Sequence, residues 1–215
     1  MANLITFARF PLLVVVVIVL YGASAASRFA AVGLLTMVIA LDSIDGIVAR
    51  ARHEESVYGS LLDIMADRVV ELVMWICYAD LGLVSVAIPL IYVARGTLVD
   101  GLRNVHVGEG TAPFKTMRTR LGRWLVGSPV MRTGYALAKL ASFAGLGVVH
   151  ALSAGGQTPA PELRSTLTLF QVASWLAVAI CLARGIPVIV EAVPLFARRP
   201  SRPSVSASDP EGRCA

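Results

Sequence analysis

Six apolar stretches, separated by short polar segments, dominate the pattern along the chain. A helix of about 20 mostly apolar residues crosses a bilayer core of about 30 Å. Stretches of about this length run from Phe7 to Tyr21, Phe29 to Ala49, Ser60 to Ala79, Leu83 to Leu102, Gly134 to Ala154 and Leu167 to Phe196. The pattern predicts an all-α fold, an integral membrane bundle of six transmembrane helices in residues 1–196. We expect Pro187 and Pro194 to kink or end the last helix.

The composition agrees with a membrane protein of one domain. Of 215 residues, 56% are hydrophobic and 15% charged, against about 25% charged in soluble domains, and the mean hydropathy is +0.73. This excludes a disordered chain and disfavours a soluble enzyme. Cys77, Cys181 and Cys214 form no framework for disulfides or zinc, so oxygen ligands would hold any metal. Residues 197–215 are rich in serine, proline and arginine, which predicts a disordered basic cytoplasmic tail.

Basic residues are unevenly distributed between the loops, and this predicts the orientation. The segment after the fourth stretch carries Arg103, Lys115, Arg118, Arg120, Arg123 and Arg132, whereas loops on the opposite side carry only Arg28 and Arg164. By the positive-inside rule, both termini lie in the cytoplasm. Residues 1–25 also have features of a cleavable signal, because Arg9 precedes an apolar run that ends in Ala23-Ser24-Ala25.

Four carboxylates lie within the second and third stretches, where an ionised side chain costs at least ~2.5 kcal/mol. Asp42 and Asp45 are three residues apart, and Asp63 and Asp67 are four apart, so each pair shares a helix face. The short loop between the two helices makes them antiparallel neighbours, with both pairs at the cytoplasmic side. Two divalent cations, Mg²⁺ or Mn²⁺, would balance four carboxylates. Their remaining coordination positions suit a diphosphate substrate.

These aspartates belong to a longer pattern, Asp42-x2-Asp45-Gly46-x2-Ala49-Arg50-x8-Gly59-x3-Asp63-x3-Asp67. It resembles the complete signature of the CDP-alcohol phosphatidyltransferases. The resemblance implies transfer of a phosphatidyl group from a CDP-lipid, CDP-diacylglycerol, to an alcohol with release of CMP, in phospholipid biosynthesis. It also implies a homodimer among membrane lipids. Six spans with both termini inside are similar to that family's membrane domain.

The same resemblance assigns roles to the motif residues. Asp42, Asp45, Asp63 and Asp67 would bind two Mg²⁺ or Mn²⁺ ions, and Asp67 would also be the general base. Gly46, Ala49 and Gly59 would let the cytidine and diphosphate approach the backbone, and Arg50 would contact phosphate.

Other segments are similar to bacterial phosphatidylglycerophosphate synthases and bear on the acceptor. They are Asn3-Leu4-Ile5-Thr6 with Arg9, which argues against signal cleavage, the run from Arg95 to Arg103, and Phe114-Lys115-Thr116. The match is partial, because Gly96 stands where that group has Glu and Arg68 where it has Lys. The likeness implies glycerol 3-phosphate as acceptor, inositol phosphate or another polar alcohol as the alternative, and a bacterial cytoplasmic membrane.

The acceptor residues expected from charge and from this likeness are Arg95, Arg103, Lys115 and Arg118. A cation within the fourth stretch needs an anion, so Arg95 binds an acceptor phosphate or pairs with Asp100 or Glu71. Lys139 and Arg184, within the last two stretches, snorkel or line the same cavity, and we favour a structural role for Arg184.

Two rival functions have weaker support. A membrane prenyltransferase also binds diphosphate through metals, but it needs a second separate Asp-rich loop and about nine spans. A cation transporter would hold its carboxylates near the bilayer midplane, whereas these lie near the cytoplasmic ends. The sequence shows no basic surface interleaved with aromatic residues, which disfavours nucleic-acid binding.

Overall fold

The computed structural model describes residues 2–51, 57–108, 128–155 and 161–197. In this part of the chain there are helices and no strands, so the predicted all-α class is confirmed. The helices are α1 (Ala2–Leu20), α2 (Ala25–Ala51), α3 (Val57–Asp80), α4 (Ala87–Gly108), α6 (Pro129–Leu152) and α7 (Pro161–Ala197), with a short 3₁₀ helix, η1 (Ser153–Gly155), after α6. Each predicted stretch overlaps one α-helix. The predicted tail, 197–215, lies almost wholly outside the described residues.

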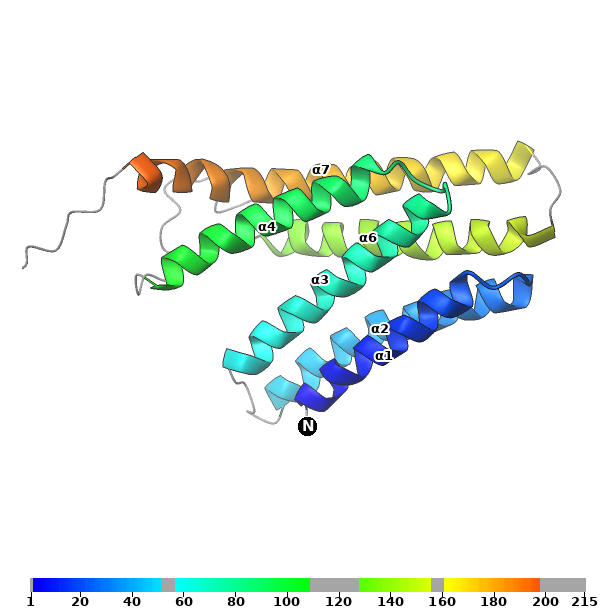
Figure 1. The fold of residues 1–215 in the computed structure, drawn as a ribbon, viewed down its shortest axis with the longest axis horizontal. Coiled ribbons are helices and arrows are strands. Elements are labelled where there is room, and N and C mark those ends of the chain that lie inside the picture. The colour runs from blue at the N-terminus through cyan, green and yellow to red at the C-terminus, as the bar shows by residue number, and fades with distance from the viewer. Residues whose placement is uncertain (1, 52–56, 109–127, 156–160, 198–215) are drawn as a thin grey trace, which may run out of the picture.

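The helices form an elongated bundle, in which each packs mainly on two others (Figure 1). The principal contacts join α1 to α2, α2 to α6, α6 to α7, α7 to α4, α4 to α3, and α3 back to α1. The helices therefore form a closed ring. Helix α3 packs mainly on α1 and α4. The short loop between α2 and α3 predicts instead that α3 packs on α2. Cleavage after Ala25 would remove α1 and open this ring.

The turn between α3 and α4 differs from the prediction that the fourth helix begins at Leu83. Gly82 has a φ of +70°, a conformation that glycine adopts without steric cost. The Leu83 N–H donates to the Tyr78 carbonyl at 2.9 Å, which closes the end of α3. The hydroxyl of Ser85 then accepts from the Ala87 N–H at 3.3 Å, and α4 begins at Ala87.

Helix α7 is longer than predicted at its start, and it continues beyond both internal prolines. It begins at Pro161, where a first-turn proline costs no hydrogen bond. It runs through Pro187 and Pro194 to Ala197, one residue beyond the predicted end at Phe196. Neither proline therefore ends the helix, and the alternative, a kink, stays a prediction. Packing against α4 and α6 stabilises a helix whose backbone loses hydrogen bonds at these prolines.

Two helical segments, Thr133–Leu152 and Pro161–Pro187, are long and apolar enough to cross a membrane by length and composition. Three shorter apolar segments lie in α1, α2 and α4. The third helix carries four charged residues between positions 63 and 71, namely Asp63, Asp67, Arg68 and Glu71. Within the described residues, the structure thus gives two clear span candidates rather than six.

An aromatic cluster fills the middle of the bundle. The indole of Trp75 stacks on Tyr92 at a centroid distance of 5.5 Å and lies 4.7 Å from Phe143. The hydroxyl of Tyr78 donates to the Phe143 carbonyl at 2.7 Å. All four side chains are buried. This cluster joins α3, α4 and α6, and of its four residues Phe143 lines the cavity described next.

Candidate active site

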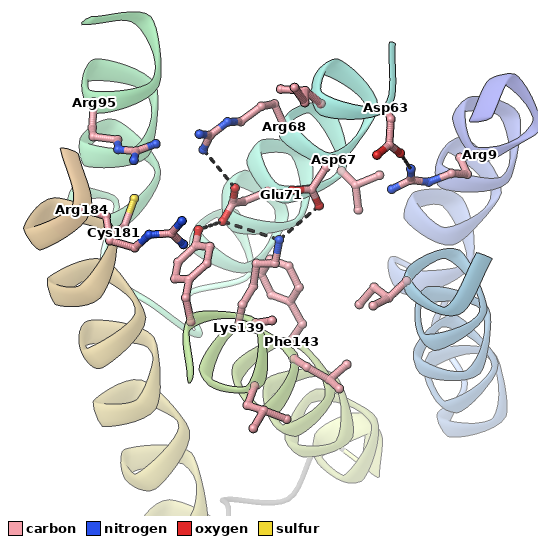
Figure 2. Close-up of a pocket in the computed structure, with 17 residues that line it drawn as sticks. Arg9, Asp63, Asp67, Arg68, Glu71, Arg95, Lys139, Phe143, Cys181 and Arg184 are labelled. Atoms are coloured by element: carbon pink, nitrogen blue, oxygen red, sulfur yellow. Dashed lines mark hydrogen bonds and ion pairs between the residues drawn. The ribbon is translucent and has the colours of Figure 1, made fainter. Parts of the chain in front are cut away.

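A cavity of about 650 Å³, lined by residues of all six α-helices described, lies beside the aromatic cluster. Its lining is unusually rich in charge for a chain of this composition (Figure 2). The charged residues that line it are Arg9, Asp63, Asp67, Arg68, Glu71, Arg95, Lys139 and Arg184. Of the two alternatives for Lys139 and Arg184, snorkelling or lining the cavity, the structure shows the second, including for Arg184, for which the sequence favours a structural role.

The motif residues are distributed over two helices. Asp42, Asp45, Gly46, Ala49 and Arg50 lie in the last part of α2, and their side chains are outside the described ones. Gly59 lies in α3, one turn before Asp63. The carboxylates of Asp63 and Asp67 both line the cavity, as their spacing predicts. Whether all four aspartates meet at one point stays a prediction.

Asp63 is paired with a cation from the first helix. Arg9 Nη1 lies 3.2 Å from Asp63 Oδ1, across 54 positions of sequence. The arginine side chain is 2% exposed, whereas that of Asp63 is 46% exposed. The N-terminal helix thus contributes Arg9 to the site.

Asp67 is paired with a cation from the opposite side. Lys139 Nζ of α6 lies 3.2 Å from Asp67 Oδ1 and 3.9 Å from Glu71 Oε1. Glu71, one turn beyond Asp67, is 2% exposed. Its carboxylate also accepts a hydrogen bond from the Tyr135 hydroxyl and lies 3.5 Å from Arg68 Nη1. A buried carboxylate is stable only with such partners.

Arg95 is the cation for which the sequence left two interpretations. Glu71 is paired with Arg68 and Lys139 rather than with Arg95, and the side chain of Asp100 is not among the described ones. The Nε atom of Arg95 is buried and, within the described chain, has no hydrogen-bond partner. A Cβ added to Gly185 of α7 would lie 2.8 Å from this Nε, so the missing side chain makes room for Arg95.

Arg95 and Arg184, from α4 and α7, lie on the same side of the cavity (Figure 2). The guanidinium of Arg184 also lies 5.9 Å from the centre of the Tyr135 ring. Of the other expected acceptor residues, Arg103 is in α4 with its side chain outside the described ones, and Lys115 and Arg118 lie outside the described residues.

The sequence did not identify Glu71 and Tyr135 as parts of the site. Glu71 follows Asp67 by four residues, as Asp67 follows Asp63, so helical spacing alone places it on the same face. Tyr135 precedes Lys139 by four residues in the same way. A charged residue within an apolar stretch is the sequence feature that could have identified Glu71 as part of the site. Nothing in the sequence distinguishes Tyr135 from a tyrosine of the core.

The described side chains alone include no cluster of three or more potential metal ligands, but the oxygen donors among them are of the type that a hard divalent cation prefers. Asp63 and Asp67 supply oxygen ligands on one helix face, half exposed to the cavity, and each is already paired with one positive group. A family model for CDP-alcohol phosphatidyltransferases matches residues 1–182. No curated protein matches the sequence.

The chain therefore belongs to the CDP-alcohol phosphatidyltransferase family. This family transfers a phosphatidyl group from a CDP-alcohol to an alcohol, as phosphotransferases of phospholipid synthesis, and is generally membrane-associated. The membership favours an enzyme over the cation transporter and the prenyltransferase.

Proposed function

We propose that this protein transfers the phosphatidyl group of CDP-diacylglycerol to glycerol 3-phosphate, with Mg²⁺ or Mn²⁺ bound by the motif aspartates. The observation that carries the proposal is the shared cavity: it has Asp63 and Asp67 on its α3 wall and the partly unpaired guanidinium of Arg95 on its α4 wall. A site with carboxylates on one side and arginines on another suits a metal-bound diphosphate donor and an anionic acceptor.

Asp42, Asp45, Asp63 and Asp67 would hold two metal ions, which when bound neutralise the diphosphate and polarise the reacting phosphoryl group. Gly46, Ala49 and Gly59 leave space beside these carboxylates for the cytidine and diphosphate, and Arg50 contacts phosphate. The support is the complete motif together with the family match over residues 1–182.

In the reaction, the acceptor hydroxyl oxygen attacks the phosphorus next to the diacylglycerol and forms a new P–O bond. The bond from this phosphorus to the oxygen that bridges it to CMP breaks, and CMP leaves with that electron pair. Asp67 takes the proton of the acceptor hydroxyl, as a positioned general base. The protein itself forms no covalent bond to the substrate.

The acceptor is proposed as a phosphorylated polyol because of the cations. Arg95 and Arg184 present guanidinium groups to the same part of the cavity, and Arg103, Lys115 and Arg118 would complete a basic entrance. A dianionic phosphate forms charge-assisted, bidentate bonds with such groups. Inositol phosphate satisfies the same chemistry and is the competing acceptor.

We further propose six membrane-spanning helices with both termini and the active site on the cytoplasmic side of a bacterial membrane, and a homodimer. The support is the basic loop after α4 together with large apolar side chains exposed on the outside of several helices. These include Ile18 at 68%, Leu90 at 63% and Leu169 at 63% exposure, which lipid would cover.

The test is CMP release by the purified protein from CDP-diacylglycerol with Mg²⁺ and a panel of acceptors. We expect glycerol 3-phosphate to exceed inositol 1-phosphate, inositol, glycerol and serine, and excess EDTA to abolish release. Preference for a neutral alcohol would contradict the acceptor, and full activity in EDTA would contradict the metal.

Two variants test the role of Arg95, one by removing its charge and the other by moving the charged group. Arg95→Ala removes the guanidinium, and Gly185→Ala displaces it by adding a methyl group 2.8 Å from Nε. Both should raise KM for the phosphorylated acceptor by about tenfold or more, while KM for CDP-diacylglycerol stays near the wild-type value. An unchanged acceptor KM in both would assign Arg95 a structural role.

A further inference from the structure

Lys139 lies outside the signature motif, 72 positions after Asp67, yet it contacts that aspartate directly. Its Nζ is 3.2 Å from Oδ1 of Asp67, and its side chain is 14% exposed. A lysine so far from solvent in an apolar helix needs anionic partners. Besides Asp67, the described residues offer it Glu71, whose Oε1 lies 3.9 Å away.

Lys139 is itself held in place by the residues around it. Glu71 is almost fully buried and is fixed by the Tyr135 hydroxyl and by Arg68. The ammonium group also lies 5.6 Å from the centre of the Tyr135 ring, within cation–π range. Tyr135 is one turn before Lys139 on α6, so the Tyr135 ring and the Glu71 carboxylate restrain the same ammonium group. The lysine therefore has little freedom to leave Asp67.

The contact with Lys139 uses one oxygen of Asp67. In the described part of the chain, only Oδ1 takes part in a hydrogen bond or ion pair, and the side chain is 45% exposed at the cavity. A half-exposed aspartate on a helix has several accessible rotamers. Tying one oxygen to a restrained cation selects an orientation and leaves the other oxygen for a ligand. Metal-binding carboxylates commonly have such hydrogen-bonded partners behind them.

We infer that Lys139, fixed by Glu71 and Tyr135, is a positioning residue that orients the Asp67 carboxylate for metal binding. The inference rests on the proposed function, in which Asp67 is a metal ligand. It also makes metal binding depend on α6, because Lys139 of this helix, which lies outside the motif, orients the carboxylate of a motif aspartate.

Opposite effects on metal affinity distinguish positioning from competition. As a positioning group, Lys139 improves binding, and its removal weakens affinity. As a competing cation, it occupies the place of the metal, and its removal tightens affinity. A purely structural lysine changes the stability of the fold and leaves the metal affinity of the folded protein unchanged.

The experiment measures Mn²⁺ dissociation constants of the purified, detergent-solubilised full chain without CDP-lipid, by the EPR signal of free Mn²⁺. Lys139→Met should weaken binding by roughly 10- to 100-fold, and Lys139→Arg should recover most of the affinity. Glu71→Gln keeps the shape of the side chain but removes its charge, so it restrains Lys139 less strongly. We expect a smaller loss of Mn²⁺ affinity, about 3- to 10-fold. This variant also provides a second measurement if Lys139→Met does not fold.

The matched control is Arg28→Met, which removes a partly buried cation that binds the carbonyls of Gly22 and His150 elsewhere in the bundle. Its Mn²⁺ affinity should equal that of the wild type. Unchanged or tighter Mn²⁺ binding in folded Lys139→Met and Glu71→Gln would overturn the inference. Absence of Mn²⁺ binding by the wild type would instead overturn the metal site of the proposed function.

Discussion

The two halves of α3 have opposite chemistry. In the first half, Asp63 and Asp67 line the cavity four residues apart, and Glu71 continues this spacing at the start of the second half. In the second half, Trp75 and Tyr78 are fully buried against Phe143 and Tyr92. The first half is stabilised by cations from α1 and α6, and the second by aromatic packing on α4 and α6. One helix thus carries the reactive groups at one end and is anchored at the other, so substitutions in the two halves should separate activity from stability.

The largest effect is expected for Trp75→Ala in the packed half. Removal of a fully buried indole that contacts Tyr92 and Phe143 leaves a large cavity, and we expect a loss of about 3 kcal/mol in unfolding free energy. Specific activity of the remaining folded protein should stay close to wild type. Denaturant unfolding in detergent measures the first quantity, and CMP release per folded molecule the second. A variant with normal stability and lost activity would remove the contrast between the halves.

Asp67→Asn tests the reactive half. The amide keeps the size of the side chain but accepts no proton, so kcat should fall at least ~10²-fold, about 2.7 kcal/mol in activation free energy. CDP-lipid binding should persist, and the unfolding free energy should change little because the side chain is half exposed. The matched substitution is Asp42→Asn, which removes a predicted metal ligand without the base. Normal turnover in Asp67→Asn beside an inactive Asp42→Asn would show that Asp67 is not the base.

Arg9→Met is expected to be intermediate. Arg9 supports Asp63 as Lys139 supports Asp67, through one contact of 3.2 Å to one oxygen. Its removal should weaken Mn²⁺ affinity by about tenfold, and Arg9→Lys should restore part of it. Equal affinity in wild type and Arg9→Met would mean that the two aspartates are held in different ways.

The apolar stretches predicted the helices well because crossing length and hydrophobicity are local properties. The ends were less accurate: α4 begins at Ala87 because of the positive φ at Gly82 and the Ser85 cap, and α7 runs past Pro187. Packing by neighbouring helices, which the sequence does not display, outweighed the local cost of that proline.

The site was predictable where residues share a helix and unpredictable where they do not. Asp63 and Asp67 were found from spacing and motif. The partners of these aspartates, Arg9 and Lys139, lie 54 and 72 positions away, and their pairing depends on how α1 and α6 pack. The same packing assigns Glu71 to Lys139 and Arg68 rather than to Arg95, which the sequence left undecided.

The smallest expected effect is that of Tyr78→Phe, which removes one hydrogen bond from the packed half. The Tyr78 hydroxyl donates to the Phe143 carbonyl at 2.7 Å, and its loss should lower the unfolding free energy by about 1 kcal/mol. Catalytic constants and Mn²⁺ affinity should be unaffected. A clear loss of Mn²⁺ affinity would show that the two halves of α3 are coupled.

The contact between Arg9 and Asp63 also has a consequence for biosynthesis. Arg9 is translated 54 residues ahead of its partner, and N-terminal segments begin to fold first. While α1 and α2 alone have left the ribosome, the Asp63 carboxylate is not yet available to this arginine. We therefore expect the contact between α1 and α3 to form only after α3 has been made, as a later step than the packing of α1 on α2.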